Sequence, residues 1–431
     1  APTDARECTR IVTWYRDGVT YRVEGVDHGG SSTQLRFDRG DRGLEIDLAG
    51  RDPGDLLRLD VTWPSSRLRE ITLVDTPGID SIDVDNSART ESFLVGTDER
   101  PTPTDAVLYL LRHVHIGDLR FLEAFHDDEM AAANPVNSIG VLSRADEIGA
   151  ARPDALDSAR RIAERWRSDP RLSRLVQTVL PVAGLLAEAA TTLREHEYRA
   201  ISRLGRADPA VVDELLVSAD RFAAGTVEVA VTGDARRELL HRFGMYGCRT
   251  AIEAVRQGRG ETASSLAETL LAASGVPDLR AEVVARLTRR RGLLKARHAF
   301  DTVQAVAEAT GDRALLGDVE RAVLAIHEFA ELRVLNALRR GDIALPDDRH
   351  RDALRLLGAD GTTIAERLGT DDTASAEELR SAAIEQRGIW RRRGEHPSAS
   401  RGVVDAANVI VRTCEGLIAA TSAVDAAPAR T

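Results

Sequence analysis

The chain has 431 residues, a formal net charge of −11 at pH 7 and 43% hydrophobic residues. This length accommodates two domains with cores of their own, and the composition is that of a globular protein. The negative charge argues against broad electrostatic binding of nucleic acid. No apolar run reaches the roughly 20 residues that span a bilayer. Cys8, Cys248 and Cys414 lie far apart without metal-site spacing, which favours a reducing compartment.

The first part of the chain alternates strand-like and helix-like segments. This order predicts an α/β domain with a mostly parallel sheet over residues 1–200. The segments 10–14 and 20–26 flank Asp17-Gly18, which predicts a β-hairpin. Further strands are expected at residues 57–63, 71–74, 106–111, 138–142 and 178–182. Helices are expected at residues 119–130, 153–166 and 185–198.

After residue 200 the strand-like segments end, and apolar residues recur at helical spacing. Val319, Val323, Ile326 and Ala330 form such a stripe. The pattern predicts an all-α, antiparallel helical bundle over residues 201–423. Residues 424–431 are rich in Ala, which predicts a disordered tail.

Asp75-Thr76-Pro77-Gly78 directly follows an apolar, β-branched run. A carboxylate in this position can reach a hydrated Mg²⁺, and a glycine lets the backbone N–H approach a terminal phosphate. The second switch loop of a GTPase begins in this way. The same tetrapeptide is also an ordinary turn signal, so by itself it leaves both interpretations open.

Two further segments close expected strands and suit the recognition of guanine. Asp146 would accept hydrogen bonds from guanine N1–H and N2–H₂, which adenine lacks. Ser143 would bond the base edge or hold the loop, and Arg144 would lie over the purine. Ala183 and Gly184 would offer backbone N–H groups to the guanine carbonyl. In the alternative interpretation Asp146 simply caps the next helix.

The phosphate-binding part of such a site has no counterpart in this sequence. Thr9 would place its hydroxyl and carbonyl near Mg²⁺ and the γ-phosphate in a first switch loop. However, no G-x-x-x-x-G-K-[ST] motif occurs, and the single lysine, Lys295, lies far downstream. Because the chain begins with Ala1 and places a first-switch segment at its very first residues, we expect it to be truncated; the resemblance described below implies that it starts roughly twenty residues after the missing motif. The alternative is a protein that has lost the motif.

The segment 338–346 is a candidate for membrane contact. Ile343 and Leu345 would insert shallowly, while Arg339 and Arg340 would meet lipid phosphates. In the alternative interpretation this is an ordinary loop between helices whose apolar side chains pack inward. A second segment, Phe243-Gly244-Met245-Tyr246-Gly247, is equally compatible with a hinge, a membrane-contacting loop or tight helix packing.

Taken in order, these motifs resemble bacterial dynamin-like GTPases, most closely the actinobacterial isoniazid-inducible subfamily. The resemblance rests on Cys8-Thr9-Arg10, on Val74-Asp75-Thr76-Pro77-Gly78 and on Ser143-Arg144-Ala145-Asp146-Glu147-Ile148-Gly149. The segments 242–247 and 293–296 also resemble the helical region of that group.

The resemblance implies a GTPase head, lacking its first strand and phosphate loop, followed by a helical trunk. It implies GTP and Mg²⁺ as cofactors, with Thr9 and Asp75 near the metal. The residues that it places in the catalytic and nucleotide-binding sites are Thr9, Asp75, Thr76, Gly78, Ser143, Arg144, Asp146, Ala183 and Gly184. The complete protein would hydrolyse GTP, whereas these 431 residues alone would be inactive without the phosphate loop.

The same resemblance implies a biological setting. Hydrolysis of GTP would drive membrane remodelling or fusion at the cytoplasmic face of the plasma membrane, with peripheral binding to anionic lipid. The head would self-associate or pair with a paralogous dynamin-like protein. Two alternatives remain: a non-catalytic pseudo-GTPase scaffold, and a GTPase that acts on nucleic acid, which the acidic balance disfavours.

Overall fold

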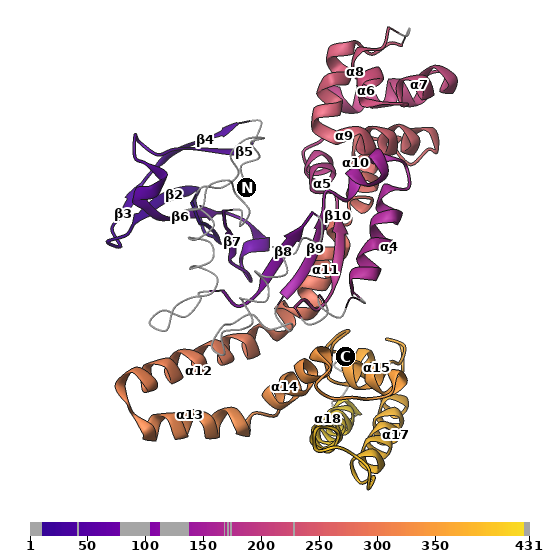
Figure 1. Cartoon of the computed structure of the whole chain (residues 1–431). Coiled ribbons are helices and arrows are strands. Elements are labelled where there is room, and N and C mark those ends of the chain that lie inside the picture. Colours follow the sequence, from indigo (N-terminus) through magenta and orange to yellow (C-terminus); the bar gives the residue numbers. More distant parts are fainter. Residues whose placement is uncertain are drawn as a thin grey trace. The chain divides into compact units, whose positions relative to one another are not determined.

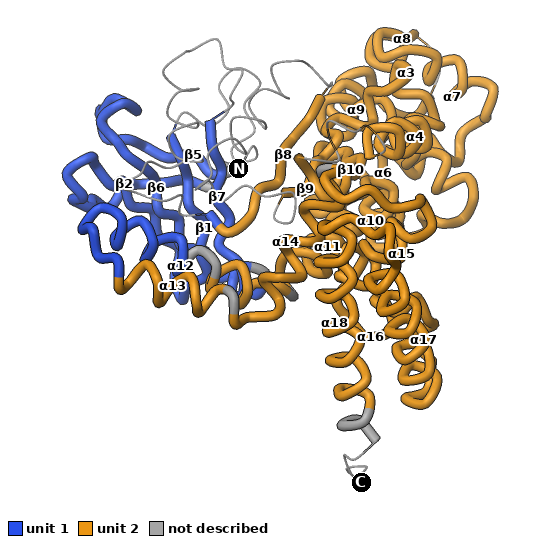
Figure 2. Tube along the Cα trace, turned by 60° about the horizontal axis from the view of Figure 1, so that its bottom comes forward, with its two compact units in different colours: residues 1–104, 127–132, 298–313 blue, residues 105–126, 133–297, 314–431 orange. Residues whose placement is uncertain are grey.

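The computed structural model describes residues 11–40, 43–77, 104–112, 138–167, 169, 172, 175–226 and 229–425. The chain divides into two compact units, which Figure 2 shows in blue and orange. Unit 1 comprises residues 1–104, 127–132 and 298–313, and unit 2 comprises residues 105–126, 133–297 and 314–431. These units do not coincide with the boundary expected at residue 200.

Unit 1 contains a five-stranded sheet in the order β3-β2-β6-β1-β7 (Figure 1). Its strands are β1 (Thr13–Asp17), β2 (Arg22–Asp27), β3 (Ser32–Gln34), β6 (Leu56–Trp63) and β7 (Leu73–Asp75). A separate antiparallel pair joins β4 (Arg36–Gly40) to β5 (Gly43–Asp47). Only β1 and β6 run parallel in the larger sheet; its other neighbours are antiparallel. The expected mostly parallel arrangement therefore does not describe this unit.

The hairpin expected at Asp17-Gly18 is wrong, because β6 lies between β1 and β2. Leu59 and Val61 of β6 are buried in the core of the unit, so this strand takes a central position. Asp17 Oδ1 accepts a hydrogen bond of 2.9 Å from the Ser65 N–H, beyond the end of β6. A Cβ atom on Gly18 would overlap the methyl group of Thr62, so a glycine is needed where the chain passes β6.

Unit 2 contains a three-stranded sheet that is entirely parallel. Its order is β10-β9-β8, formed by β8 (Val107–Leu111), β9 (Ser138–Ser143) and β10 (Val179–Val182). The first five residues of β9 are all buried, which is typical of a parallel strand covered on both faces. The parallel sheet expected from the sequence is confirmed here.

Helices make up most of the remaining described chain, and the largely helical second half is confirmed. Those nearest the parallel sheet in sequence are α3 (Ile148–Ala151), α4 (Ala155–Arg167), α5 (Gly184–Thr191), α6 (Glu195–Arg206), α7 (Pro209–Leu215), α8 (Ala219–Ala224), α9 (Gly233–Arg256), α10 (Ala263–Ala272) and α11 (Val276–Arg286). The later helices are α12 (Arg291–Thr310), α13 (Arg313–Ala325), α14 (His327–Arg340), α15 (Asp347–Leu356), α16 (Ile364–Leu368), α17 (Ala376–Gly394) and α18 (Arg401–Asp425). None of the described helices is both long and apolar enough to cross a lipid bilayer.

One apolar core joins the parallel sheet to helices on both sides of residue 200. It includes Val179 of β10, Leu186 of α5, Ile201 of α6 and Phe243 of α9. All four side chains are at most 1% exposed. Helices that follow residue 200 therefore share their core with the sheet, which is why unit 2 extends across that position.

The helix expected over residues 185–198 is divided into α5 and α6. The Thr192 hydroxyl donates to the Glu188 carbonyl at 2.8 Å and so satisfies the last turn of α5. At the start of α6 the Glu197 carboxylate accepts from the Arg194 N–H at 2.8 Å, as in a capping box. Local capping thus ends one helix and begins another within an apparently continuous pattern.

The C-terminal helices pack around Trp390, which lies on α17 and is fully buried. Replacing a buried tryptophan by alanine removes apolar contacts and leaves a cavity. We therefore expect Trp390→Ala to lower the free energy of unfolding by about 3–5 kcal/mol, measured by denaturant titration. Ile384→Ala is the control on the same helix, because Ile384 is 43% exposed. Equal losses in the two variants would contradict the packing described here.

Candidate nucleotide-binding site

The loops after β9 and β10 leave the parallel sheet from the same edge. Val182 and Ser143, the last residues of these strands, are paired in the parallel register. The Ser143 hydroxyl donates to the Leu111 carbonyl at the end of β8, at 3.1 Å. Ser143 was expected either to bond the edge of the base or to hold the loop, and this hydrogen bond holds the loop. The carboxyl edge of such a sheet is where open α/β folds bind ligands.

The chain turns sharply at Arg144, which has a left-handed backbone with φ 52° and ψ 40°. This conformation costs a residue with a Cβ on the order of 1–2 kcal/mol. The turn directs Ala145 and Asp146 into the protein, where they are 0% and 7% exposed. The Arg144 guanidinium stays exposed and lies 3.3 Å from Glu147 Oε1. A strained turn thus separates an outward cation from a buried carboxylate.

Burial raises the pKa of Asp146 above its ordinary value, and the hydrogen bond from its own backbone N–H opposes this shift. The nearby charge of Glu147 adds to the increase, whereas Arg144 reduces it. Asp146 forms no ion pair with any residue that the structure describes. A buried carboxylate that lacks a fixed cation is typical of a site that meets a ligand.

Helix α9 passes beside this carboxylate at a glycine. Gly244 has a φ of 64° and a ψ of 175°, which interrupts the helix. A Cβ atom at Gly244 would lie 3.6 Å from Asp146 Oδ2 and 3.7 Å from Leu185 Cδ2. Leu185 is 42% exposed, so an apolar side chain faces solvent beside the carboxylate. Neither Gly244 nor Leu185 was expected in the site, because nothing local in their sequence indicates that they approach Asp146.

The segment 243–247 packs tightly, as one of its three interpretations predicted. Phe243 is fully buried, and a Cβ atom on Gly247 would lie 3.0 Å from Leu186 Cδ1. Such a distance is tighter than most Cβ contacts, so a side chain here would push Leu186 aside, and α5 and α9 are in close contact. The glycines serve the approach of two helices within the core of unit 2.

Ala183 and Gly184 were expected to offer backbone N–H groups to a guanine carbonyl, and the two N–H groups have different surroundings. The Ala183 N–H donates to the Ser274 carbonyl at 2.8 Å, so this group already has a partner within the protein. Gly184 is exposed and is the first residue of α5. The first N–H groups of a helix have no carbonyl partner within that helix, so Gly184 remains a candidate donor.

Arg249 of α9 holds the backbone that follows Asp146. Its guanidinium donates to the Ala151 carbonyl at 2.5 Å and to the Ala150 carbonyl at 3.4 Å. On its other side it donates to the Leu216 carbonyl at 2.6 Å. Ala150 and Ala151 both have positive φ angles, of 59° and 57°. The arginine therefore stabilises a strained turn next to the buried carboxylate, a role that the sequence pattern did not reveal.

The Asp75 segment lies in unit 1. Asp75 ends β7 and is paired with Thr13 in the antiparallel register with β1. Asp75 and Thr76 are both half-buried. Burial, with the negative charge of Asp75 nearby, raises the pKa of Tyr15 to about 12. Tyr15 was not expected here, and it comes close because β1 and β7 are neighbours.

Thr9 and Gly78 lie outside the described residues, so their expected roles stay predictions. The same holds for the helix expected over residues 119–130. Among the residues of the candidate site, Asp75 and Thr76 belong to unit 1. Ser143, Arg144, Asp146, Ala183 and Gly184 belong to unit 2.

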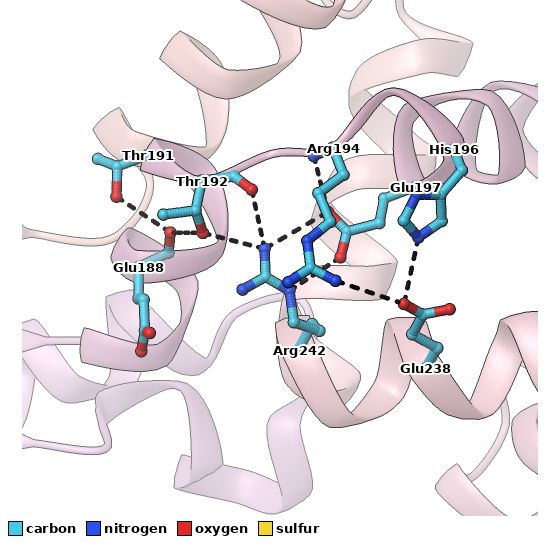
Figure 3. A network of polar contacts seen from close by, with 8 residues as sticks. All are labelled: Glu188, Thr191, Thr192, Arg194, His196, Glu197, Glu238 and Arg242. Carbon is cyan, nitrogen blue, oxygen red and sulfur yellow. Dashed lines mark hydrogen bonds and ion pairs between the residues drawn. The ribbon is translucent and has the colours of Figure 1, made fainter. Parts of the chain in front are cut away.

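A polar network on α5, α6 and α9 is the group of described residues that most resembles a metal site (Figure 3). His196, Glu197 and Glu238 each offer a ligand atom within 4.8 Å of the others. However, Glu197 is 1% exposed, and its two oxygens accept from the Arg242 guanidinium and the Arg194 N–H, each at 2.8 Å. Arg242 already supplies the positive charge, so the cluster is a structural clamp.

The residues expected at a membrane-contacting tip are placed differently from that expectation. Ile343 is 7% exposed and packs beside Gly402, at the start of α18. Burial, together with the charges of Arg286 and Arg290, lowers the pKa of Arg339 to about 9. Leu345 is half-buried, and the side chain of Arg340 lies outside the described atoms. The burial of Ile343 agrees with the alternative, a loop whose apolar side chains pack inward.

Comparisons with known proteins identify close relatives by sequence. No protein-family model matches the chain. The isoniazid-induced protein IniC of Mycobacterium tuberculosis, from strains CDC 1551 / Oshkosh and ATCC 25618 / H37Rv, is 37% identical over 426 residues. The match covers 98% of this chain and 86% of the relative. A solved structure of an oligomerised bacterial dynamin pair contains a chain that is 13% identical, with a TM-score of 0.22. The match covers 97% of this chain and 80% of that one.

Asp146 allows a test of the balance between stability and ligand binding. Burial raises the pKa of Asp146 in the folded protein. The protonated carboxyl therefore contributes to the free energy of unfolding at pH values below the pKa of the unfolded chain. This contribution is lost as the pH rises through the pKa of the folded protein. We expect Asp146→Asn to increase the free energy of unfolding of the ligand-free protein at about pH 7. This increase should shrink as the pH falls towards about 4.

Denaturant titrations at several pH values measure this dependence. Asp372→Asn is the matched control, because Asp372 is exposed and its substitution removes the same charge. The control should change stability little at any pH. A lower stability of Asp146→Asn at neutral pH would show that the carboxylate is well accommodated in the folded protein.

Proposed function

We propose that this chain, which belongs to the isoniazid-induced IniC family of dynamin-like proteins, binds guanine nucleotides and hydrolyses GTP. The observation that carries the proposal is the buried Asp146 carboxylate at the carboxyl edge of the parallel sheet, without an ion-pair partner among the described residues. A site for guanine needs such an acceptor, because N1–H and N2–H₂ both donate.

The neighbours of Asp146 suit the rest of a purine base. The first N–H of α5, at Gly184, would donate to the guanine carbonyl. The exposed Leu185 would contact one face of the ring, and the Arg144 guanidinium would lie over the other. The base would replace solvent at the small exposed part of Asp146, where a charge-assisted hydrogen bond is strong.

Hydrolysis would depend on the switch residues. The Asp75 carboxylate, at the end of β7, would hold Mg²⁺ through water, and Thr9 would contact the same ion. A bound Mg²⁺ would supply positive charge to the β- and γ-phosphates. The carboxylate is a fitting ligand, since Mg²⁺ prefers oxygen donors. The N–H groups of Thr76 and Gly78 would position the γ-phosphate.

One observation favours a second function, a non-catalytic scaffold. The 431 residues contain no G-x-x-x-x-G-K-[ST] motif and a single lysine, Lys295. The phosphate loop supplies most of the contacts to the β-phosphate, so hydrolysis needs a full protein that contains one. Without a phosphate loop, the site around Asp146 would still bind a guanine base weakly, so the protein would sense the nucleotide without hydrolysing it.

The proposal includes a setting for the activity. The protein would act as a peripheral protein on anionic lipid at the cytoplasmic face of the plasma membrane, remodelling or fusing membranes. It would associate with itself through the GTPase head or with a paralogous dynamin-like protein. A net charge of −11 argues against nucleic acid as the partner.

Guanine recognition is tested by titration calorimetry of the full protein with GTP and ATP. We expect Asp146→Asn to weaken GTP binding by about 1–3 kcal/mol, roughly 5- to 150-fold, because an acceptor for two donors is lost. Asp372→Asn is the control, since Asp372 is exposed and its substitution removes the same charge. Equal GTP affinities of the wild type and Asp146→Asn would remove Asp146 from the site.

The switch assignment is tested by measuring GTP turnover and affinity together. Asp75→Ala and Thr9→Ala should reduce turnover more than affinity, because both groups act where charge shifts during hydrolysis. Thr72→Ala, an exposed position just before β7, should change neither quantity. Unchanged turnover in Asp75→Ala would contradict the assignment, and a wild-type protein that binds GTP without turnover would favour the scaffold.

A further inference from the structure

A cavity of about 450 Å³ lies along α6, and its lining includes none of the residues assigned to the nucleotide. Its lining combines an aromatic ring, a serine, three arginines and two alanines: Tyr198, Ser202, Arg199, Arg203, Arg206, Ala207 and Ala230. The volume falls within the usual range for small-molecule pockets, roughly 300–1,000 Å³. A small ligand therefore fits the cavity without any rearrangement of the helix.

The three arginines of the lining repeat at helical spacing and project from one face of α6. Arg199 forms an ion pair with Glu195 at 2.9 Å. Arg203 and Arg206 are both exposed, and neither forms an ion pair within the part of the chain that the structure describes. Like charges three residues apart on a helix repel one another by a few tenths of a kcal/mol. The cavity therefore carries positive charge that an anion would compensate.

A simpler explanation covers part of this arrangement. Arg203 and Arg206 lie in the last turn of α6, where cations interact favourably with the helix dipole. That effect accounts for two basic residues at a helix end. It does not account for a cavity beside them, nor for the third arginine a full turn earlier.

Two other groups make the cavity suitable for a polar ligand. Ser202 is 7% exposed, and its hydroxyl has no hydrogen-bond partner in the described part of the chain. The oxygen of this hydroxyl is itself buried, so it would meet an acceptor on a ligand only after a small rotation of the side chain. Tyr198 is fixed in place, because its hydroxyl donates to the Glu261 carbonyl. The ring and the two alanines leave room for a small apolar part of the ligand next to the charged end.

We propose that this cavity binds the phosphate group of a small phosphorylated ligand. Arg203 and Arg206 would hold the phosphate oxygens, since planar guanidinium groups bind phosphate through paired hydrogen bonds. Arg199 would contribute at the edge, where its ion pair with Glu195 is exposed and easily exchanged. The phosphate belongs either to a soluble compound or to a lipid headgroup, and it is recognised separately from GTP.

The test compares the full-length wild type with the double variant Arg203→Gln, Arg206→Gln. The matched control is Arg161→Gln, Arg165→Gln, which removes the same charge from exposed positions of α4. One arm titrates inorganic pyrophosphate by calorimetry at several salt concentrations. The other arm sediments vesicles of phosphatidylcholine with phosphatidic acid, and with phosphatidylserine at equal surface charge.

We expect saturable binding in at least one arm, reduced about tenfold or more in the cavity variant and unchanged in the α4 control. Loss confined to pyrophosphate indicates a soluble ligand, and loss of the preference for phosphatidic acid indicates a lipid. GTP affinity should be equal in the wild type and in both double variants. The result for the cavity therefore does not depend on whether Asp146 binds guanine. Equal losses in both double variants, or no binding in either arm, would overturn the proposal.

Discussion

The buried ion pair between Arg242 of α9 and Glu197 of α6 is the contact on which the geometry of the candidate site depends. Glu197 is almost fully buried, so removing either partner would leave a charge without compensation, at a cost of about 3–5 kcal/mol. Arg242 also donates to the Thr192 carbonyl at 3.0 Å, between α5 and α6. One side chain thus fixes α9 against both helices (Figure 3).

With α9 held at Arg242, its next two turns determine the surroundings of Asp146. Gly244 comes beside the carboxylate, Gly247 comes against Leu186, and Arg249 reaches the Ala151 carbonyl. Each position favours a particular residue type: Gly244 has a backbone conformation that glycine adopts readily, Gly247 is in close contact with Leu186, and Arg249 is a long donor. The loop after β9 is therefore positioned by a helix about 100 residues later, as well as by its own sheet.

The stretch 143–151 combines several features that do not favour folding. Arg144, Ala150 and Ala151 have left-handed backbones, and Asp146 is a buried carboxylate with a raised pKa. Each such feature costs on the order of 1 kcal/mol or more, and the hydrogen bonds of Arg249 offset part of this cost. A loop that combines strained backbone conformations with a buried carboxylate is typical of a functional site.

The sequence predicts what depends on neighbouring residues and misses what depends on distant ones. The strands β8, β9 and β10 were predicted from short apolar runs between polar segments, and β6 from its alternation of apolar and polar residues. The order of the strands in unit 1 was missed, because pairing β1 with β6 is decided by packing across about 45 residues. Asp146 could be identified from its motif, whereas Leu185, Gly244 and Arg249 come from other segments. The sequence left two interpretations open for Ile343, because its packing position beside Gly402 lies on another helix.

The central claim, that Asp146 recognises guanine, is tested most directly by exchanging the base. Xanthine carries a carbonyl where guanine carries the N2 amino group, so an asparagine amide would donate to it and a carboxylate would repel it. The measurement is the ratio of the affinities for GTP and XTP in the wild-type full-length protein and in Asp146→Asn. The account predicts that the wild type prefers GTP and that the variant prefers XTP, each by about tenfold or more. The same ratio in both proteins would contradict it.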